Sequence, residues 1–188
     1  MSSKRKAEAT RWFRQAEYDL KAARWNIQGG FYDTACFLAQ QTGEKALKSL
    51  LYYLGARRTA LFTHSLVEMI QTVGKKVPAL TGLLQAAREL DLHYIPARYP
   101  DGLPSGYPHQ FYGKETADKA VGAVEQLLTA VAEHYRAAGE TDDRSSPALF
   151  AGAADGKTRP HRGHRPALRC AAVAEARARP EARLFSAG

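Results

Sequence analysis

The sequence predicts an all-α protein, an up-and-down bundle of four long helices with one short helix inserted, followed by a disordered C-terminal tail. Three observations lead to this prediction. In four long segments, apolar residues recur at steps of three and four, which is the spacing of one face of an α-helix. No segment alternates apolar and polar residues as a half-buried strand does. Glycine or proline stands at several of the expected helix boundaries.

The first two helices are expected at about residues 10–28 and from Tyr32 or Asp33 to Leu54. The apolar positions of the first are Trp12, Ala16, Leu20, Ala23 and Ile27, and Gly29-Gly30 is expected to end it. The second has its main apolar face at Ala35, Ala39, Thr42, Ala46, Leu50 and Leu54, and Gly55 is expected to close it. Gly43 lies inside this helix, where glycine costs about 1 kcal/mol, so it marks either a close helix–helix approach or a tolerated defect.

Three further helices follow. The residues Ser65-Leu-Val-Glu68 fit a capping box, in which the serine and glutamate side chains satisfy each other's backbone amides, and they predict a short third helix. Pro78 suits the first turn of a fourth helix that runs to about Leu92. The last helix is expected from Lys114 to Tyr135, with its apolar face at Ala117, Ala120, Val121, Val124, Leu128, Val131 and Tyr135.

Between the last two helices lies a segment with prolines at positions 96, 100, 104 and 108. These prolines predict that no helix passes through it. The segment and the residues just after it are also rich in aromatic side chains, which is not typical of a flexible linker. We therefore expect a long, ordered, non-helical loop with a turn at Asp101-Gly102, and such loops often carry function. Arg98 lies inside it.

Composition sets the domain organisation and the class of protein. Residues 1–138 are expected to form the helical domain, and residues 139–188 a low-complexity, disordered tail rich in Ala, Arg, Pro and Gly. The tail holds nine Lys/Arg and six Asp/Glu, a net of +3, which leaves +5 of the total charge of +8 for the rest. A basic balance favours phosphate-bearing partners, although basic surfaces without such partners are equally common.

The chain shows no sign of a membrane or secreted protein. It has no run of 18 apolar residues, and its N-terminus lacks the apolar core of a signal peptide. The only two cysteines, Cys36 and Cys170, do not predict a disulfide framework, and Cys36 is expected to pack in a core helix. The simplest interpretation is a cytoplasmic protein without membrane association.

Three blocks of the sequence resemble the HEPN domain family of small prokaryotic helical proteins. The first is the loop sequence Tyr94-Ile-Pro-Ala-Arg-Tyr-Pro-Asp101, the second begins Gly30-Phe-Tyr-Asp-Thr-Ala-Cys, and the third is Thr63-His-Ser-Leu-Val-Glu68. Together the blocks span about residues 10–137 in the order of the family, with Gly43 as one departure. The resemblance implies a homodimer that binds a nucleotide and accompanies a minimal (MNT-type) nucleotidyltransferase in a toxin–antitoxin-like pair.

The expected ligand site combines the proline loop with a polar stripe on the second helix. Arginine and lysine hold phosphates, and aromatic rings stack on bases, so the candidate ligand-binding residues are Lys45, Lys48, His64, Tyr94, Arg98 and Tyr99. Two alternatives stay open. The stripe of Gln41, Glu44, Lys45 and Lys48 also fits a solvated helix face, and either Asp91 or Asp101 could pair with Arg98 inside the chain.

A second hypothesis is a metal-independent endoribonuclease. Other members of the resembling family carry an arginine four to six residues before a histidine, for phosphate binding and proton transfer. Matches here are Arg88 with His93, Arg58 or Arg57 with His64, and Arg159 with His164 in the tail, so the spacing is weak support. Five residues on one helix place Arg88 and His93 about 140° apart. Under this second hypothesis, RNA is the partner.

Neither a metal site nor a cofactor is expected, because His109 and His134 lack acidic or cysteine neighbours at ligand spacing and no glycine-rich phosphate loop is present. The preferred hypothesis is a HEPN-domain binding protein, with Tyr99 as a candidate acceptor of a nucleotidyl group. A purely structural helical dimerisation module is the third hypothesis.

Overall fold

The computed structural model describes residues 3–140, and these residues contain helices and no strand. All but the first two residues of the predicted disordered tail lie outside the described part of the chain. The elements are α1 (Ser3–Gln28), α2 (Tyr32–Tyr53), α3 (Leu66–Val73), α4 (Leu84–Asp91), α5 (Pro108–Phe111) and α6 (Lys114–Ala137), with short 3₁₀ helices η1 (Arg58–Leu61), η2 (Pro78–Leu83) and η3 (Pro100–Gly102). The predicted all-α class is confirmed.

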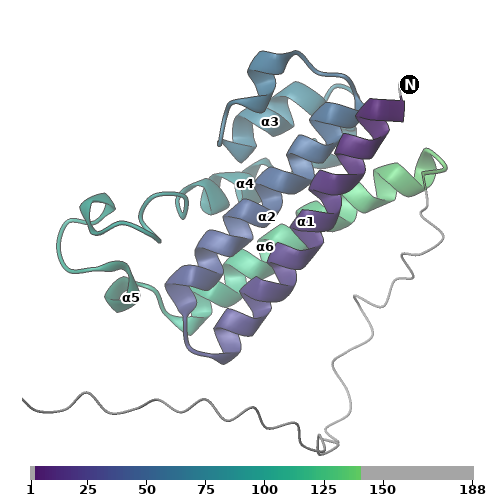
Figure 1. Cartoon of the computed structure of the whole chain (residues 1–188). Helices are drawn as coiled ribbons and strands as arrows, with labels where there is room; N and C mark the ends of the chain where they lie inside the picture. Colours follow the sequence, from purple (N-terminus) through teal and green to yellow (C-terminus); the bar gives the residue numbers. More distant parts are fainter. Residues whose placement is uncertain (1–2, 141–188) are drawn as a thin grey trace, which may run out of the picture. The chain divides into compact units, whose positions relative to one another are not determined.

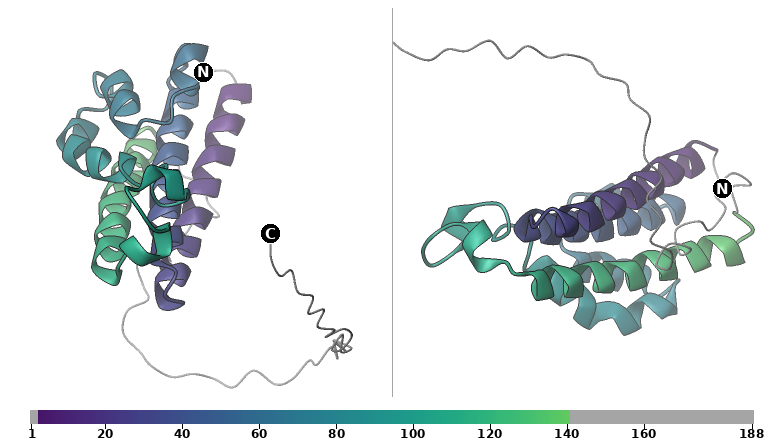
Figure 2. Two further views of the ribbon diagram at one scale, coloured as in Figure 1. Left: turned by 90° about the vertical axis from the view of Figure 1, so that its left-hand side faces the viewer. Right: turned by 90° about the horizontal axis from the view of Figure 1, so that it is seen from below.

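Three long helices, α1, α2 and α6, lie side by side, α3 packs against α2 and α4, and α4 packs against α2 and α6 (Figures 1 and 2). The chain passes down α1 and up α2, returns through α3, η2 and α4, and passes up α6. The return is made by shorter helices, and the expected fourth helix is η2 followed directly by α4. Helix α2 is central, because it contacts α1, α3, α4 and α6.

The expected fourth helix is helical over its predicted length but changes type within it. Residues Pro78–Leu83 form the 3₁₀ helix η2, and the α-helix begins only at Leu84. The Thr81 hydroxyl donates a 2.7 Å hydrogen bond to the Pro78 carbonyl, and Gly82 follows, which is a poor helix former. The tighter 3₁₀ turn is common at the start of an α-helix, and here these residues favour it.

The proline segment was expected to be non-helical, and the structure corrects this in part. Pro100 and Pro108 each begin a single turn, η3 and α5 respectively. Proline is tolerated at the first position of a helix because its missing N–H would have no partner there. No long helix passes through the segment, as predicted, and local backbone hydrogen bonds hold its first half, residues 93–103.

The long helices end at glycines, as the sequence predicts for Gly30 and Gly55. Gly30, Gly55 and Gly139 have φ of 78°, 66° and 72°, in the left-handed region that glycine adopts without strain. After α1, the Gly30 amide bonds to the Ile27 carbonyl and the Phe31 amide to the Asn26 carbonyl, at 3.1 and 2.9 Å. This is the Schellman arrangement, and it repeats after α2 and α6.

Gly43 is explained by a close approach of elements. A β-carbon added at this position would lie 3.0 Å from Cδ1 of Leu66 and 3.5 Å from Cγ2 of Val124. Glycine therefore lets the middle of α2 come close to the start of α3 and to α6. The close-approach interpretation of this residue is confirmed.

The core is built on two kinds of packing. Helix α1 packs against α2, and three of its five buried residues are alanines, Ala9, Ala16 and Ala23, while α2 buries Ala35, Ala39 and Ala46 among others. Larger side chains fill the space between α2, α3, α4 and α6, namely Leu47, Leu50, Leu66, Met69, Ile70, Leu80, Leu90, Val124 and Leu127. The small residues allow two helix axes to lie close together, and the larger ones bury most of the apolar area.

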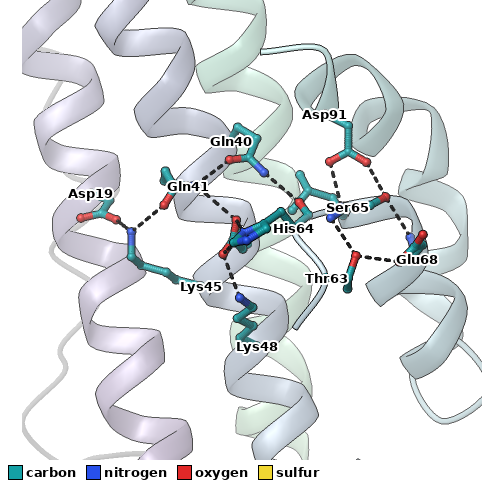
Figure 3. Close-up of polar contacts among 12 residues, drawn as sticks. Asp19, Gln40, Gln41, Lys45, Lys48, Thr63, His64, Ser65, Glu68 and Asp91 are labelled. Atoms are coloured by element: carbon teal, nitrogen blue, oxygen red, sulfur yellow. Dashed lines mark hydrogen bonds and ion pairs between the residues drawn. The ribbon is translucent and has the colours of Figure 1, made fainter. Parts of the chain in front are cut away.

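Half of the predicted capping box at Ser65 is present. The Ser65 hydroxyl accepts from the Glu68 amide at 3.3 Å, whereas the Glu68 carboxylate accepts from the Thr63 hydroxyl at 2.6 Å and not from the Ser65 amide. Asp91, at the end of α4, takes over the rest of the cap (Figure 3). Its carboxylate accepts from the Ser65 hydroxyl at 2.8 Å and from the amides of Leu66 and Val67 at 2.8 and 3.3 Å.

We predict that Asp91→Ala lowers the free energy of unfolding by about 2 kcal/mol, because it removes a charged acceptor from three donors at the start of α3. Urea unfolding followed by circular dichroism measures the change. The matched control is Asp101→Ala, which removes an exposed aspartate without a hydrogen bond to the described residues and should change stability by less than about 0.5 kcal/mol. Equal effects of the two variants would contradict the capping role.

Candidate functional site

The polar stripe of α2 lies largely inside the bundle: Glu44 and Lys48 are buried, and Gln41 and Lys45 are half-buried, so it is not a fully solvated face. Glu44 is 5 % exposed and Lys48 is 6 % exposed. The Lys48 ammonium donates to Oε1 of Glu44 at 2.9 Å and lies 5.6 Å from the centre of the Trp12 ring on α1. Burying two charges is costly unless they pair, and this pair is joined by further donors.

Lys45 also has a carboxylate partner, Asp19 of α1, with which it forms an ion pair (Figure 3). The Asp19 carboxylate accepts a second hydrogen bond, from Nε2 of Gln15 at 2.7 Å. The ammonium groups of Lys45 and Lys48 are thus both neutralised by carboxylates of the same chain. The sequence offered one signal for one pair, the four-residue spacing of Glu44 and Lys48, and none for Asp19.

His64 connects this buried network to the surface. Its backbone carbonyl accepts from Nε2 of Gln40 at 3.0 Å, which fixes the segment before α3 against α2. Its ring Nδ1 lies 3.2 Å from each carboxylate oxygen of Glu44, while the side chain is 52 % exposed. In this geometry a protonated Nδ1 donates to the carboxylate, and Nε2 has no hydrogen bond to the described residues. Glu44 therefore orients His64, a role that the sequence did not predict.

The exposed Arg98 lies among aromatic rings. Its guanidinium carbon is 4.4 Å from the ring centre of Phe37 on α2, 4.8 Å from that of Tyr99 and 5.5 Å from that of Tyr94. Within residues 3–140, Arg98 forms no ion pair. Asp91 caps α3, and Asp101 does not pair with Arg98, so neither aspartate is the partner that the alternative interpretation required.

Tyr94 joins His64 to Arg98. Its ring stacks on the His64 imidazole with centres 4.9 Å apart and planes 17° apart, and Arg98 lies over the same ring. We call Phe37, His64, Tyr94, Arg98 and Tyr99 the Arg98 cluster. Chemically, it offers a guanidinium for an anion and flat rings for stacking on a base. Of the six predicted ligand residues, the structure brings His64, Tyr94, Arg98 and Tyr99 together, and it buries Lys48 beneath His64 through Glu44.

The arginine and histidine pairs of the ribonuclease hypothesis are not joined by contacts within the described residues. The exposed Arg88 reaches Oε1 of Gln85 at 3.4 Å, and Arg58 lies over the Phe62 ring at 5.9 Å. His93 packs edge-on against Tyr112, with Nδ1 3.4 Å from the phenol oxygen. Burial lowers the pKa of His93 and raises the pKa of Tyr112 to about 12.

The described residues offer little other reactive chemistry. Burial raises the pKa of the Cys36 thiol to about 12, so it stays protonated and packs in the core. Residues 3–140 contain no group of three His, Cys, Asp or Glu side chains placed to hold a metal ion. In the same part of the chain, every helix is too short or too polar to cross a lipid bilayer.

Comparison with known proteins gives one matching family model and several similar solved structures. The model of one protein family, the HEPN domain, matches residues 9–135. Three solved structures are similar. TT1696 from Thermus thermophilus has 34 % identity and a TM-score of 0.63, with 67 % of this chain and 97 % of that chain covered. ST0689, an archaeal HEPN homologue, has 35 % identity and a TM-score of 0.57, with 68 % and 97 % covered.

The third structure, a HEPN domain protein from Thermotoga maritima, has 27 % identity and a TM-score of 0.53, with 67 % of this chain and 98 % of that chain covered. Among curated proteins, none matches this chain. The similar structures are thus covered almost completely by this chain.

We predict that Glu44→Ala lowers the free energy of unfolding by about 3 kcal/mol or more, because it leaves the Lys48 ammonium buried without its carboxylate. The double variant Glu44→Leu/Lys48→Met should recover most of this loss, since two apolar side chains need no partner. Urea unfolding of each variant measures the effect.

The matched control is the exposed pair of Glu115 and Lys119 on α6, which has the same four-residue spacing. Glu115→Ala should cost less than about 0.5 kcal/mol, because an exposed ion pair contributes little. A loss at Glu44 that is no larger than the loss at Glu115 would contradict the burial argument.

Proposed function

Because the chain belongs to the HEPN domain family, we propose that it is a HEPN-domain binding protein whose Arg98 cluster binds a nucleotide. The observation that carries the proposal is the guanidinium of Arg98, which is exposed, is surrounded by three aromatic rings and lacks a carboxylate partner within residues 3–140. Lys45 and Lys48, the two lysines predicted to bind the ligand, differ in this respect, since each has a carboxylate partner.

The contacts of Arg98 suit phosphate recognition. A guanidinium has five N–H donors in a fixed fork, and those of Arg98 make no hydrogen bond within the described residues. Contact with ring faces restricts the side chain without using these donors for an oxygen acceptor. The donors are therefore free to bind two oxygens of a phosphate group in the bidentate manner.

The rings beside Arg98 provide the second half of nucleotide recognition. Tyr99 is 46 % exposed, and His64 and Tyr94 form a stacked pair next to it. Stacking of a base on an aromatic side chain contributes about 1–3 kcal/mol. A phosphate on Arg98 and a base on these rings together account for a nucleotide-sized ligand.

The proposed partners are a second copy of this chain and a minimal nucleotidyltransferase in a toxin–antitoxin-like pair. Family membership supports both, and the exposed Tyr99 gives such a transferase an acceptor. In the transfer, the phenol oxygen of Tyr99 attacks the α-phosphorus of a nucleoside triphosphate. A new oxygen–phosphorus bond forms, pyrophosphate leaves, and the phenol proton passes to a base of the transferase.

The ribonuclease remains the second candidate function, and one contact favours it. Glu44 holds Nδ1 of His64 and leaves Nε2 without a hydrogen bond within the described residues, and the Tyr94 ring contacts both His64 and Arg98. A histidine for proton transfer and an arginine for a phosphate thus belong to one cluster. This candidate predicts RNA cleavage in the presence of EDTA that His64→Ala abolishes. A structural dimerisation module, the third candidate, predicts neither cleavage nor nucleotide binding.

We predict that Arg98→Ala weakens nucleotide binding about tenfold to a hundredfold, because hydrogen bonds to a charged group contribute about 1.5–3 kcal/mol. Calorimetric titration with ATP, GTP and AMP measures the affinity, and a thermal shift reports the linked stabilisation. Arg98→Lys keeps the charge but loses the fork, so it should fall between wild type and Arg98→Ala.

The control is Arg88→Ala, which removes an equal charge from an exposed arginine whose hydrogen bond within the described residues is to Gln85. It should leave the affinity unchanged. Wild-type protein that binds none of the three nucleotides at millimolar concentration would refute the proposed ligand, and equal losses for Arg88→Ala and Arg98→Ala would refute the proposed site.

We predict that incubation with a minimal nucleotidyltransferase, Mg²⁺ and ATP adds the mass of one AMP residue to the chain, and that Tyr99→Phe prevents it. Intact-mass spectrometry measures the change, and Tyr107→Phe on the same loop is the control. An unchanged mass of wild-type protein would contradict the acceptor role without affecting nucleotide binding by Arg98.

A further inference from the structure

A basic region separate from the Arg98 cluster lies at the end of the bundle opposite to α5, where α1 begins and α2 ends (Figure 1). It contains a pocket of about 320 Å³ between the end of α2, η1 and the end of α3. Its apolar lining includes Leu54 and Val73, and its polar side chains are Arg57, Thr59, Thr72 and Lys76. None of the residues that line it is acidic.

Further cations adjoin this pocket, Arg5 in space and Arg58 and Lys75 in the sequence. Gly55, part of the lining, is so close to Arg5 of α1 that a β-carbon on the glycine would lie 2.5 Å from the Arg5 Nη1 atom. Arg58, the first residue of η1, follows Arg57, and Lys75 precedes Lys76. Arg5, Arg57, Arg58, Lys75 and Lys76 are all exposed.

No carboxylate of the described residues pairs with these five cations. Within residues 3–140 none of them forms an ion pair, and the acidic Glu140 at this end is already paired with Lys6. The Lys76 ammonium has only a long hydrogen bond, 3.5 Å, to the Leu54 carbonyl. Lys45 and Lys48 of α2 each pair with a carboxylate, whereas within residues 3–140 these five cations do not. A cluster of like charges repels itself and attracts polyanions.

We propose that this end of the bundle binds the phosphates of a single-stranded nucleic acid, with one phosphate in the pocket between Arg57 and Lys76. Five cations exceed what the phosphate of one mononucleotide neutralises, which favours a strand of several phosphates over a free nucleotide. The exposed ring of Phe62 lies under Arg58 at 5.9 Å and gives a base of that strand a surface for stacking. This site is separate from the Arg98 cluster.

The test is fluorescence anisotropy of labelled single-stranded RNA and single-stranded DNA of one sequence, with the full chain, over a series of salt concentrations. For Arg57→Gln/Lys76→Gln we expect a dissociation constant about tenfold higher at low salt for each strand that the wild-type chain binds. We also expect the slope of log affinity against log salt to be smaller by about 1.4, because each lost phosphate contact removes about 0.7 for single strands.

The control variant, Arg88→Gln/Lys119→Gln, removes the same charge from exposed positions on α4 and α6 and should keep the wild-type affinity and slope. The basic residues after position 140 are common to all variants, so they do not affect the comparison. Circular dichroism verifies that both variants are folded.

Three outcomes would overturn the proposal. The first is equal weakening of binding by both double variants. The second is a wild-type chain that binds neither strand at low salt. The third is full competition by AMP at the concentration that saturates the pocket, which would indicate a mononucleotide site. Tighter binding of RNA than of DNA, lost in Arg57→Gln/Lys76→Gln, would identify RNA as the strand. Loss of Arg98-dependent nucleotide binding would leave the proposal unaffected, since Arg98 is at the other end.

Discussion

The arrangement of the Arg98 cluster depends on how the short segment Thr63–Ser65 satisfies its hydrogen bonds between α2 and α4. Gln40 and Glu44 of α2 hold His64, and Asp91 of α4 holds Ser65 and the first amides of α3. The carbonyl of Asp91 then accepts from the Tyr94 amide at 3.2 Å, at the start of the loop that carries Arg98. A polar segment inside a bundle must find such partners, and here the partners connect three elements and place Tyr94 against His64.

Much of the fold could be predicted from the sequence because its signals are local. Gly30 and Gly55 end helices through their own backbone geometry, and Ser65 begins α3 through a side chain three residues from its partner. The apolar spacing located the long helices for the same reason. Local signals failed where two helix types compete, as at Thr81 and Gly82, and where prolines begin single turns.

The candidate site could be predicted only in part. The prolines and aromatic residues of the loop indicated Arg98 as a site residue, and the family resemblance indicated His64. Burial of Glu44 and Lys48 could not be predicted, because helical periodicity places polar residues outward, whereas α2 is surrounded by α1, α3, α4 and α6. A central helix has no outward face over most of its length. Its polar residues must then pair, and the partners Asp19 and His64 lie at least 20 residues away in the sequence.

The alanines between α1 and α2 have a consequence for the hydration of the charged network. Ala9, Ala16 and Ala23 hold α1 close to α2, and α1 carries both Trp12, which lies beside the Lys48 ammonium, and Asp19, which pairs with Lys45. A larger side chain at one of these alanines would move α1 outward and admit water between the helices. Water would weaken the attraction within both ion pairs, and with it the support beneath His64. The small size of three side chains therefore keeps water away from the ion pair that supports a histidine on the other side of α2.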